Sequence, residues 1–381
     1  MSLDLNMAHQ LFAESTDFTV GIEEEFQILD PGTLELTSGF ERMAEAASAI
    51  DGLAGSVAGE LISSEIEIRS GKGENFAHAV ALQARHRDQL FALAESQGLL
   101  LGALGAHPFS EWQKQRIINT EHYHRVEDGL KYVAWRNNTF SLHAHVGING
   151  ADRAIAVCDR VREILPELLA ISASSPFVDG RDSGLASART QIFTRMFPRC
   201  GVPDAFGGWA AYQEFIEFLV RTKSVIESTQ LWWSVRPHHS FGTVEVRICD
   251  APPNGQDSTA PAGLIVGCVA QAARDYDDGV PFTPLAPRMI EENLWRAIRF
   301  GLDGKLIDLR RREEYPAAAA ADRLLEWSAP VRAELGIDPQ LPELNATQRL
   351  RLAGLGPRES LAESLRETAA TYRGSQAPAA R

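Results

Sequence analysis

The sequence has few of the features that mark several common classes of protein. It contains only four cysteines, Cys158, Cys200, Cys249 and Cys268, without a CxxC pair or a spacing typical of a metal site. We therefore expect free thiols in a reducing cytoplasm. The sequence also lacks a GxxxxGK[ST] loop and a GxGxxG motif, which argues against a P-loop or Rossmann nucleotide site.

Positive charge and long apolar runs are scarce as well. Lys and Arg number 37 against 51 Asp and Glu, a formal charge of −14, which argues against nucleic acid and anionic membrane partners. The apolar stretches near 99–106 and 264–273 are too short to span a bilayer. Residues 1–17 contain acids and lack the leader of a signal peptide. We expect a cytoplasmic protein with small-molecule partners.

Length and composition are those of an ordinary globular protein. The 381 residues are 44% hydrophobic and 23% charged, enough for a full core. No polar stretch is long enough to be a domain linker. We predict a single catalytic domain over residues 18–373, with an N-terminal extension before it and a flexible tail over 374–381. The sequence leaves homo-oligomer formation open.

The segment 18–28, FTVGIEEEFQI, has the alternation of a strand and carries three consecutive glutamates. Because strand side chains alternate between faces, Glu23 and Glu25 share one face opposite the apolar residues. Glu24 falls on the apolar face, and we expect it near an edge of the sheet. Two carboxylates on one strand face indicate either solvated charge or a cation site.

Three further segments repeat this arrangement of one apolar and one chemically active face. Their active faces carry Glu65, Glu67 and Arg69 in residues 60–69, His143 and His145 in residues 140–148, and Thr243, Glu245, Arg247 and Cys249 in residues 241–249. An amphipathic helix over residues 74–97 is expected to cover the apolar side. The fold class predicted is α+β, a curved and mainly antiparallel sheet with helices packed on its outer face.

Such a sheet gathers the glutamates, the histidines and Arg247 onto one concave surface. Two carboxylates about 5 Å apart repel by roughly 3 kcal/mol at an effective dielectric constant of 20, so five of them need protons or cations. Carboxylates with one or two imidazoles and no thiolate suit Mg²⁺ or Mn²⁺ better than Zn²⁺. Several such ions beside arginines suit ATP, with transfer of its γ-phosphoryl group to an anionic acceptor.

Other segments are expected to border this surface. Residues 175–189 form a loop whose Arg181 and Arg189 could close over an anionic substrate. Strand 99–106 leads to His107, which is either presented to the same region or held as a hydrogen-bonded loop residue. Near Glu245, three residues indicate the wall of a polar pocket: Trp232, Trp233 and Arg236.

The chain resembles the carboxylate–amine ligases of the YbdK type, within the second family of glutamate–cysteine ligases, over roughly residues 18–304. The resemblance rests on motifs whose order and spacing are specific together. They are GIEEEF at 21–26, EIE at 65–67, HPF at 107–109, HAHVGI at 143–148, SPFVDGRDSGLASAR at 175–189, RPHHSFGTVEVRICD at 236–250 and NLWRAIRFGLDG at 293–304.

The resemblance implies a glutamine-synthetase-like sheet and ATP-dependent amide formation. A carboxylate, the γ-carboxylate of glutamate first of all, would be phosphorylated to an acyl phosphate and attacked by an amine such as cysteine. HAH stands where HVH is frequent and Val178 where an aromatic residue is common, so the amine is left open. A metal-dependent phosphohydrolase and a catalytically silent metabolite-binding protein are the alternatives.

The resemblance also implies roles for individual residues. The ligands of the ATP-bound metals would be Glu23, Glu25, Glu67, His143 and Glu245, with Glu65 or Glu60 in addition. By alternation Glu60 lies off their face, so it would need a β-bulge to contribute. Arg247 resembles the arginine beside the transferred phosphoryl group. Arg189 and Arg236 are candidates for holding phosphate or a substrate carboxylate.

Overall fold

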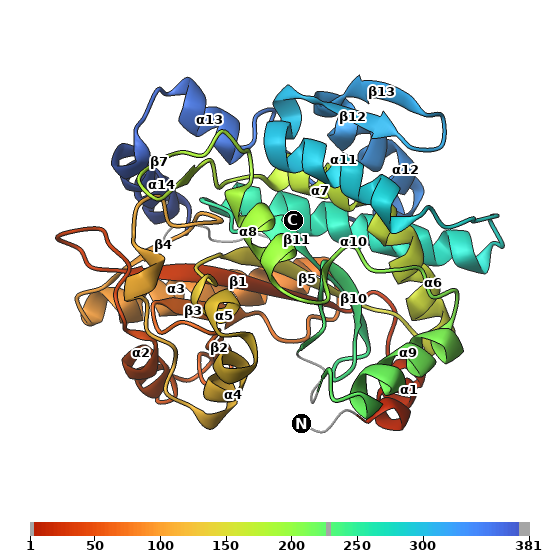
Figure 1. Ribbon diagram of the computed structural model, residues 1–381, viewed down its shortest axis with the longest axis horizontal. Coiled ribbons are helices and arrows are strands. Elements are labelled where there is room, and N and C mark those ends of the chain that lie inside the picture. The colour runs from red at the N-terminus through yellow and green to blue at the C-terminus, as the bar shows by residue number, and fades with distance from the viewer. Residues whose placement is uncertain (1–3, 226–229, 373–381) are drawn as a thin grey trace.

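The computed structural model describes residues 4–225 and 230–372, and a seven-stranded antiparallel sheet crosses its centre (Figure 1). The strand order is β10-β11-β5-β1-β3-β2, and β4 also pairs with β1. These strands are β1 Val20–Leu29, β2 Val57–Ala58, β3 Glu65–Arg69, β4 Leu100–Gly102, β5 Ser141–Gly147, β10 Val235–His238 and β11 Thr243–Asp250.

Helices cover the apolar face of this sheet, which confirms the predicted α+β class. Alternate residues of β1, β5 and β11, such as Ile22, Ala144 and Val246, are buried in one core with residues of the covering helices. A second cluster joins Phe26 and Ile66 to the helices Phe40–Ala47 and Phe76–Ser96. The covering helices are α2 Phe40–Ala47, α3 Phe76–Ser96, α6 Ala151–Val161, α7 Leu165–Ser172 and α10 Gly255–Asp277.

The other elements surround this two-layer centre. Helix α1 packs into the main core through Leu5, Ala8 and Phe12, although it belongs to the predicted N-terminal extension. The remaining helices are α1 Leu5–Ala13, α4 Glu121–Leu130, α5 Tyr132–Trp135, α8 Ala188–Met196, α9 Trp209–Arg221, α11 Pro287–Phe300, α12 Ala320–Leu335, α13 Ala346–Leu352 and α14 Pro357–Tyr372. Short strand pairs are β6 Phe177–Val178 with β7 Arg181–Asp182, β8 Cys200–Gly201 with β9 Trp232–Trp233, and β12 Lys305–Asp308 with β13 Glu313–Pro316.

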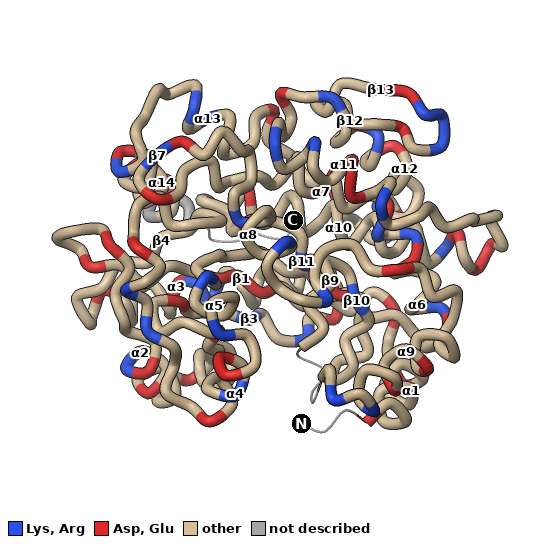
Figure 2. The backbone as a smooth tube through the Cα atoms, in the orientation of Figure 1, with Lys and Arg blue, Asp and Glu red and all other residues tan. Residues whose placement is uncertain are grey.

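Several global expectations can be compared with this structure. Acidic and basic residues are interspersed along the chain (Figure 2). All four cysteines are free thiols, as predicted. Within the described residues, no helix combines the length and apolar character needed to cross a membrane. The tail predicted over 374–381 lies outside the described residues.

The prediction that Glu24 lies near a sheet edge is wrong. Strand β1 is central, with β5 on one side and β3 on the other, and Glu24 is fully buried beneath the helical layer. There it accepts hydrogen bonds from Arg87 at 2.9 Å, from Gln83 at 2.7 Å and from Ser258. The alternation of the strand predicted the face on which Glu24 lies. Its hydrogen-bond partners belong to α3 and α10, which only the tertiary fold brings together.

Strand β11 also departs from simple alternation. Its pairing with β5 shifts register between Val246 and Cys249, which is a β-bulge. The bulge turns Cys249 into the hydrophobic core, whereas alternation had placed it on the face of Glu245 and Arg247. The face that carries those two residues therefore ends at Arg247.

The buried ion pair between Glu24 and Arg87 makes a prediction for stability. Arg87→Met should lower the free energy of unfolding by about 3–5 kcal/mol, because it leaves a buried carboxylate without its cation. Urea unfolding of the full chain measures this. Arg85→Met, at an exposed position of the same helix, is the control. Adding Glu24→Gln to Arg87→Met should recover part of the loss. Equal free energies of unfolding for Arg87→Met and Arg85→Met would contradict a stabilising role for the ion pair between Glu24 and Arg87.

Candidate active site

The face of the sheet opposite α3 and α10 forms one wall of a cleft of about 390 Å³. Cross-strand register gathers the polar residues there: Glu23 stands opposite both His143 and Arg69, and Glu25 stands opposite Glu67. Residues paired in this way have Cβ atoms roughly 5 Å apart. Of the predicted site residues, the cleft is lined by Glu23, Glu25, Glu60, Glu65, Glu67, Arg189, Arg236, Glu245 and Arg247.

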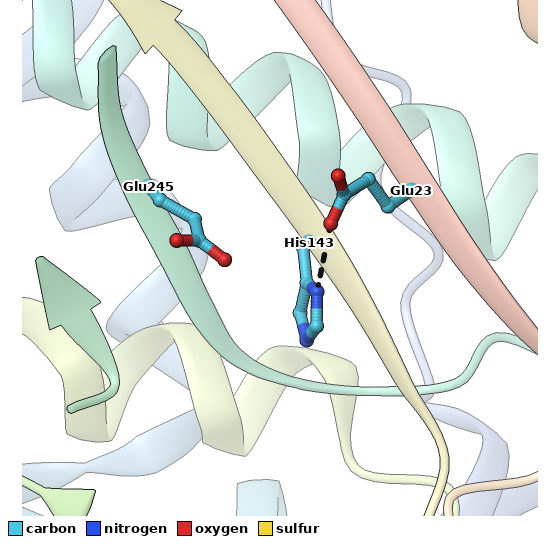
Figure 3. Close-up of side chains that lie close together, drawn as sticks. All are labelled: Glu23, His143 and Glu245. Carbon is cyan, nitrogen blue, oxygen red and sulfur yellow. Dashed lines mark hydrogen bonds and ion pairs between the residues drawn. The ribbon is translucent and has the colours of Figure 1, made fainter. Parts of the chain in front are cut away.

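His143 lies between two groups of side chains that could each hold a cation. The first group is Glu23, His143 and Glu245, from three neighbouring strands (Figure 3), with ligand atoms within 4.8 Å of one another. The second is Glu25, Glu67 and His143. The Nδ1 atom of His143 is 3.2 Å from Glu23, and its Nε2 atom is 3.7 Å from Glu25. The imidazole therefore presents a different nitrogen to each group.

Two arginines hold the carboxylate of Glu245. Arg236 donates to it from Nε at 2.5 Å and from Nη2 at 3.2 Å, and Arg247 donates from Nη1. Burial raises the pKa of Glu245, but these two guanidinium groups outweigh it and hold that pKa well below its usual range. Glu245 is therefore ionised at neutral pH, and any cation of the first group would share it with both arginines.

The other carboxylates of the cleft repel one another. Burial, and then the charge of Glu25, raise the pKa of Glu65 well above its usual value, and both of its oxygens are buried without a hydrogen-bond partner among the described residues. Burial and the charge of Glu23 raise the pKa of Glu67 in the same way. Burial raises the pKa of Glu23, but the interactions with His145 and His143 outweigh burial, and the pKa lies well below its usual value.

These observations fit a divalent cation. The oxygens of Glu65 lack donors, and the donor set consists of carboxylates with the imidazole of His143, a combination that suits Mg²⁺ or Mn²⁺. Burial and the charge of Arg247 lower the pKa of His143, which keeps the ring neutral, as a ligand must be. The cluster could therefore bind metal without any change of protonation at the imidazole.

Glu60 reaches the cleft by a route that differs from the expectation. Strand β3 begins only at Glu65, so residues 60–64 are not extended and alternation does not apply to Glu60. Glu60 lines the cleft from the preceding loop without a β-bulge. Burial and the charge of Glu25 raise its pKa to about 7. The error came from extending the strand pattern of EIE too far towards the N-terminus.

Arg189, one of the two arginines in the loop predicted over 175–189, lies in a helix in the structure. Arg189 belongs to α8 and is buried, with Nη1 2.9 Å from the carbonyl of Ile248 and Nη2 3.1 Å from that of Arg247. It thus ties α8 to β11, while its Nε atom has no partner among the described residues. Arg181 is exposed on β7 and does not line the cleft.

Two further predicted neighbours of the site lie elsewhere. His107 is a hydrogen-bonded loop residue, the second of the two alternatives: its Nε2 is 2.9 Å from the carbonyl of Leu34, and its Nδ1 accepts from Ser110. Burial lowers its pKa to about 4. Trp232 lines the cleft as expected, but Trp233 is buried in the hydrophobic core.

Several residues that line the cleft were not predicted from the sequence to have a role there. Arg69 bridges Glu67 at 2.5 Å and Glu23 at 3.5 Å, and its place on the active face of EIEIR was a signal that it belongs to the site. Ser141 donates its hydroxyl to Glu25 at 2.6 Å. The far wall, formed by His122, Tyr123 and Val126 of α4, carried no signal, because its position depends on tertiary packing alone.

A second cavity of about 330 Å³ adjoins the cleft. Glu23, Arg69, Ser240 and Phe241 line both, so the two spaces share a border. His145, which shares its strand face with His143 as predicted, lines the second cavity rather than the first; its Nε2 is 3.4 Å from Glu23. Glu23 of the carboxylate cluster therefore borders two adjacent cavities.

Comparison with known proteins bears on this geometry. The family model of glutamate–cysteine ligase family 2 matches residues 19–374 of this chain. A Sorangium cellulosum protein provisionally named glutamate–cysteine ligase 2 is 41% identical over 310 residues, 81% of this chain and 82% of its own. One from Rubrobacter xylanophilus, provisionally named glutamate–cysteine ligase 2-3, is 35% identical over 370 residues, 94% and 99% of the two chains.

A solved structure extends the comparison to the fold. The glutamate–cysteine ligase of Francisella tularensis, in complex with AMP, is similar to this structure with a TM-score of 0.65. The match covers 96% of this chain and 91% of that one at 13% identity. At this identity the likeness concerns the fold, and it agrees with the sheet and helical layer described above.

The raised pKa of Glu60 predicts how pH and metal act together on stability. A carboxyl group whose pKa is higher in the folded state stabilises that state while protonated, and the contribution is lost as pH rises through about 7. The metal-free protein should therefore melt at a lower temperature near pH 8 than near pH 6, and Mg²⁺ should raise the melting temperature more at the higher pH. Thermal unfolding with chelator and with Mg²⁺ checks this.

The variant Glu60→Gln serves as the matched comparison for this experiment. It keeps the size of the side chain and removes the titrating proton, so the extra effect of Mg²⁺ at the higher pH should shrink. An equal Mg²⁺-induced shift at both pH values in the unaltered protein would contradict the proposed coupling.

Proposed function

This chain belongs to glutamate–cysteine ligase family 2, and we therefore propose that it is an ATP-dependent ligase that joins the γ-carboxylate of glutamate to an amine. The observation that carries the proposal is the cluster of glutamates around His143, beside Arg247, on one sheet face. A carboxylate and a triphosphate are both anionic, so a site that joins them needs cations on one side and fixed positive charge on the other.

Mg²⁺ or Mn²⁺ fits either group of ligands around His143, and the neutral imidazole, which has a lone pair on one nitrogen only, would serve one ion. The residues that would hold the ions are Glu23, Glu25, Glu67, His143 and Glu245, with Glu60 and Glu65 adjoining them. When bound, the ions would neutralise phosphate charge. Ser141 fixes the carboxylate of Glu25 through its hydroxyl and its backbone N–H, so that ligand is already oriented.

Arg247 is the best placed residue to stabilise the transferred phosphoryl group. Burial alone would lower its pKa, but Glu245 reverses the effect and raises it, so the guanidinium group stays charged. Its Nη1 is used by Glu245, whereas its Nε is buried without a partner among the described residues. That N–H is available to a phosphoryl oxygen.

Arg189 and Arg236 act differently in this proposal. Arg236 makes its paired hydrogen bonds to Glu245 and thus orients that ligand. Arg189 uses two nitrogens on carbonyl groups of β11 and retains Nε. Its remaining N–H could contact the substrate carboxylate, while its other bonds fix the strand segment that carries Arg247.

The nucleotide base would occupy the second cavity. Phe241 is 53% exposed there and stacks on His238, with ring centroids 4.3 Å apart and planes 13° apart. Lys72 lines the same cavity. An exposed ring and a nearby cation suit a purine and its phosphates. The triphosphate would then extend towards Glu23, which borders both chambers.

The reaction follows from this placement. An oxygen of the γ-carboxylate attacks the γ-phosphorus of ATP, the bond to the β-phosphate oxygen breaks, and ADP leaves. The amine nitrogen then attacks the acyl carbon, loses a proton, and phosphate leaves with the electron pair of the C–O bond. Arg247 stabilises charge on the phosphoryl group, and the fixed geometry of the sheet aligns the reactants. We also propose a cytoplasmic location, in keeping with the four free thiols.

The proposal predicts how ADP release depends on substrates. With ATP and Mg²⁺, ADP should appear only when glutamate and an amine are both present, and the product should have the mass of the amide. A coupled ADP assay with mass spectrometry measures both. Phosphate release from ATP or phosphate esters without an amine would favour a phosphohydrolase instead. Nucleotide binding without any turnover would favour a metabolite-binding protein.

Removal of one ligand oxygen gives a second prediction. Glu25→Gln should lower kcat at least about 100-fold, because the amide is a poorer metal ligand. The melting temperature of the metal-free protein should not fall by more than a few degrees, since the change also relieves repulsion with Glu67. Glu45→Gln, on the exposed side of α2, is the matched control and should keep full activity. Unchanged turnover in Glu25→Gln would overturn the metal assignment.

A further inference from the structure

One side of the cleft is built from aromatic rings that the proposed phosphoryl transfer does not use. Phe193, Phe197 and Trp232 line the cleft, and we call them the aromatic wall. The ring centroids of Phe193 and Phe197 are 4.7 Å apart, and those of Phe197 and Trp232 are 5.5 Å apart. The three rings therefore form one continuous apolar surface.

The aromatic wall has a fixed position relative to the reacting groups. Arg189 and Phe193 are four residues apart on α8, so they share a helix face about 6 Å apart along its axis, and Phe197 follows one turn later. Because Arg189 is bonded to the carbonyl groups of Ile248 and Arg247, this face is anchored beside β11. The rings thus begin next to the site of transfer and lead away from it.

The opposite side of this chamber is also largely apolar. Leu61 and Val126 are 4% and 9% exposed, and Tyr123 packs against the same cluster of core residues. All three line the cleft. The carboxylates and guanidinium groups of the cleft are instead on the sheet and at Arg189 and Glu60, while α4 adds the imidazole of His122. A substituent that extends from the sheet between α4 and α8 therefore meets rings and aliphatic groups.

We propose that the amine substrate carries an aromatic or bulky apolar substituent, which packs against the aromatic wall. The inference rests on the proposed ligase function and names its acceptor. Phe197 is only 6% exposed, so a substituent would meet mainly Phe193 and Trp232, and the single CH₂–SH group of cysteine would cover little of them. A phenyl ring can instead make tilted or edge contacts with Phe193 and Trp232, and it buries a larger apolar area.

The nucleobase is the other aromatic group in the reaction, and the geometry assigns it elsewhere. Lys72 lines only the second cavity, Phe241 lines both, and the members of the aromatic wall line only the first cavity. Both cavities are bordered by Glu23 and Arg69, beside which the phosphoryl group would be transferred. Donor and acceptor would therefore approach the transferred group from the side of the aromatic wall.

The test compares amines that differ only in the ring. With full-length protein, ATP, Mg²⁺ and glutamate, kcat/KM is measured for phenethylamine, ethylamine, cysteine and hydroxylamine from amine-dependent ADP release. Phenethylamine should exceed ethylamine about 50-fold, because burial of a phenyl ring contributes binding that ethylamine lacks. It should also exceed cysteine. Equal values for phenethylamine and ethylamine, or a clear preference for cysteine, would overturn the assignment.

Variants connect this preference to the aromatic wall. Phe193→Ala should lower the phenethylamine-to-ethylamine ratio about tenfold. Trp232→Leu should lower it as well, while the KM for ATP stays the same. Phe218→Ala, at a 50% exposed ring on α9, is the control and should leave the ratio unchanged. A rise in the KM for ATP with an unchanged amine ratio would mean that the wall binds nucleotide, and would overturn the proposal.

Hydroxylamine separates failure of this inference from failure of the proposed function. It is a small, strong nucleophile that needs no side-chain pocket. ADP release with hydroxylamine but without a ring preference overturns the acceptor assignment and leaves the ligase function standing. Absence of ADP release with every amine, hydroxylamine included, overturns the ligase function and the acceptor assignment with it.

Discussion

Mutual repulsion among the carboxylates on one face of the sheet is the constraint on which the rest of the structure depends. Six glutamates line the cleft with four arginines, and burial together with the charges of neighbouring carboxylates raises the pKa values of Glu60, Glu65 and Glu67. A sheet holds such charges in place because its backbone hydrogen bonds fix the strands regardless of the side chains. In the proposed function, a bound cation would relieve this repulsion.

The apolar side of the same strands supplies the stability that this arrangement needs. Ile22, Phe26 and their neighbours pack under α3 and α10, and Glu24 is compensated there by Arg87. Two adjacent glutamates of β1 thus lie in different environments. Glu24 is neutralised within the protein by a fixed cation, whereas Glu23 faces the cleft and remains available to a mobile one.

The two cavities differ in the chemical character of the residues that line them. Glu23 and Arg69 of the sheet border both cavities together with Phe241, which we propose as a contact of the nucleotide, and the aromatic wall lines only the first cavity. Arg189 connects these parts, because its side chain is bonded to β11 and its helix carries Phe193. In the proposed ligase, different elements would therefore carry the phosphate chemistry and the choice of amine.

The sequence by itself determined the alternating faces of β1, β5 and most of β11, and hence that Glu23, Glu25, His143 and Glu245 share a surface, because a side-chain period of two depends only on local backbone geometry. Local pattern could not locate the start of β3 or the bulge in β11, which placed Glu60 and Cys249. The tertiary structure alone decided the partners of Glu24, the anchoring of Arg189 and the wall opposite the sheet. Each of these depends on contacts between elements far apart in the chain, which no local period encodes.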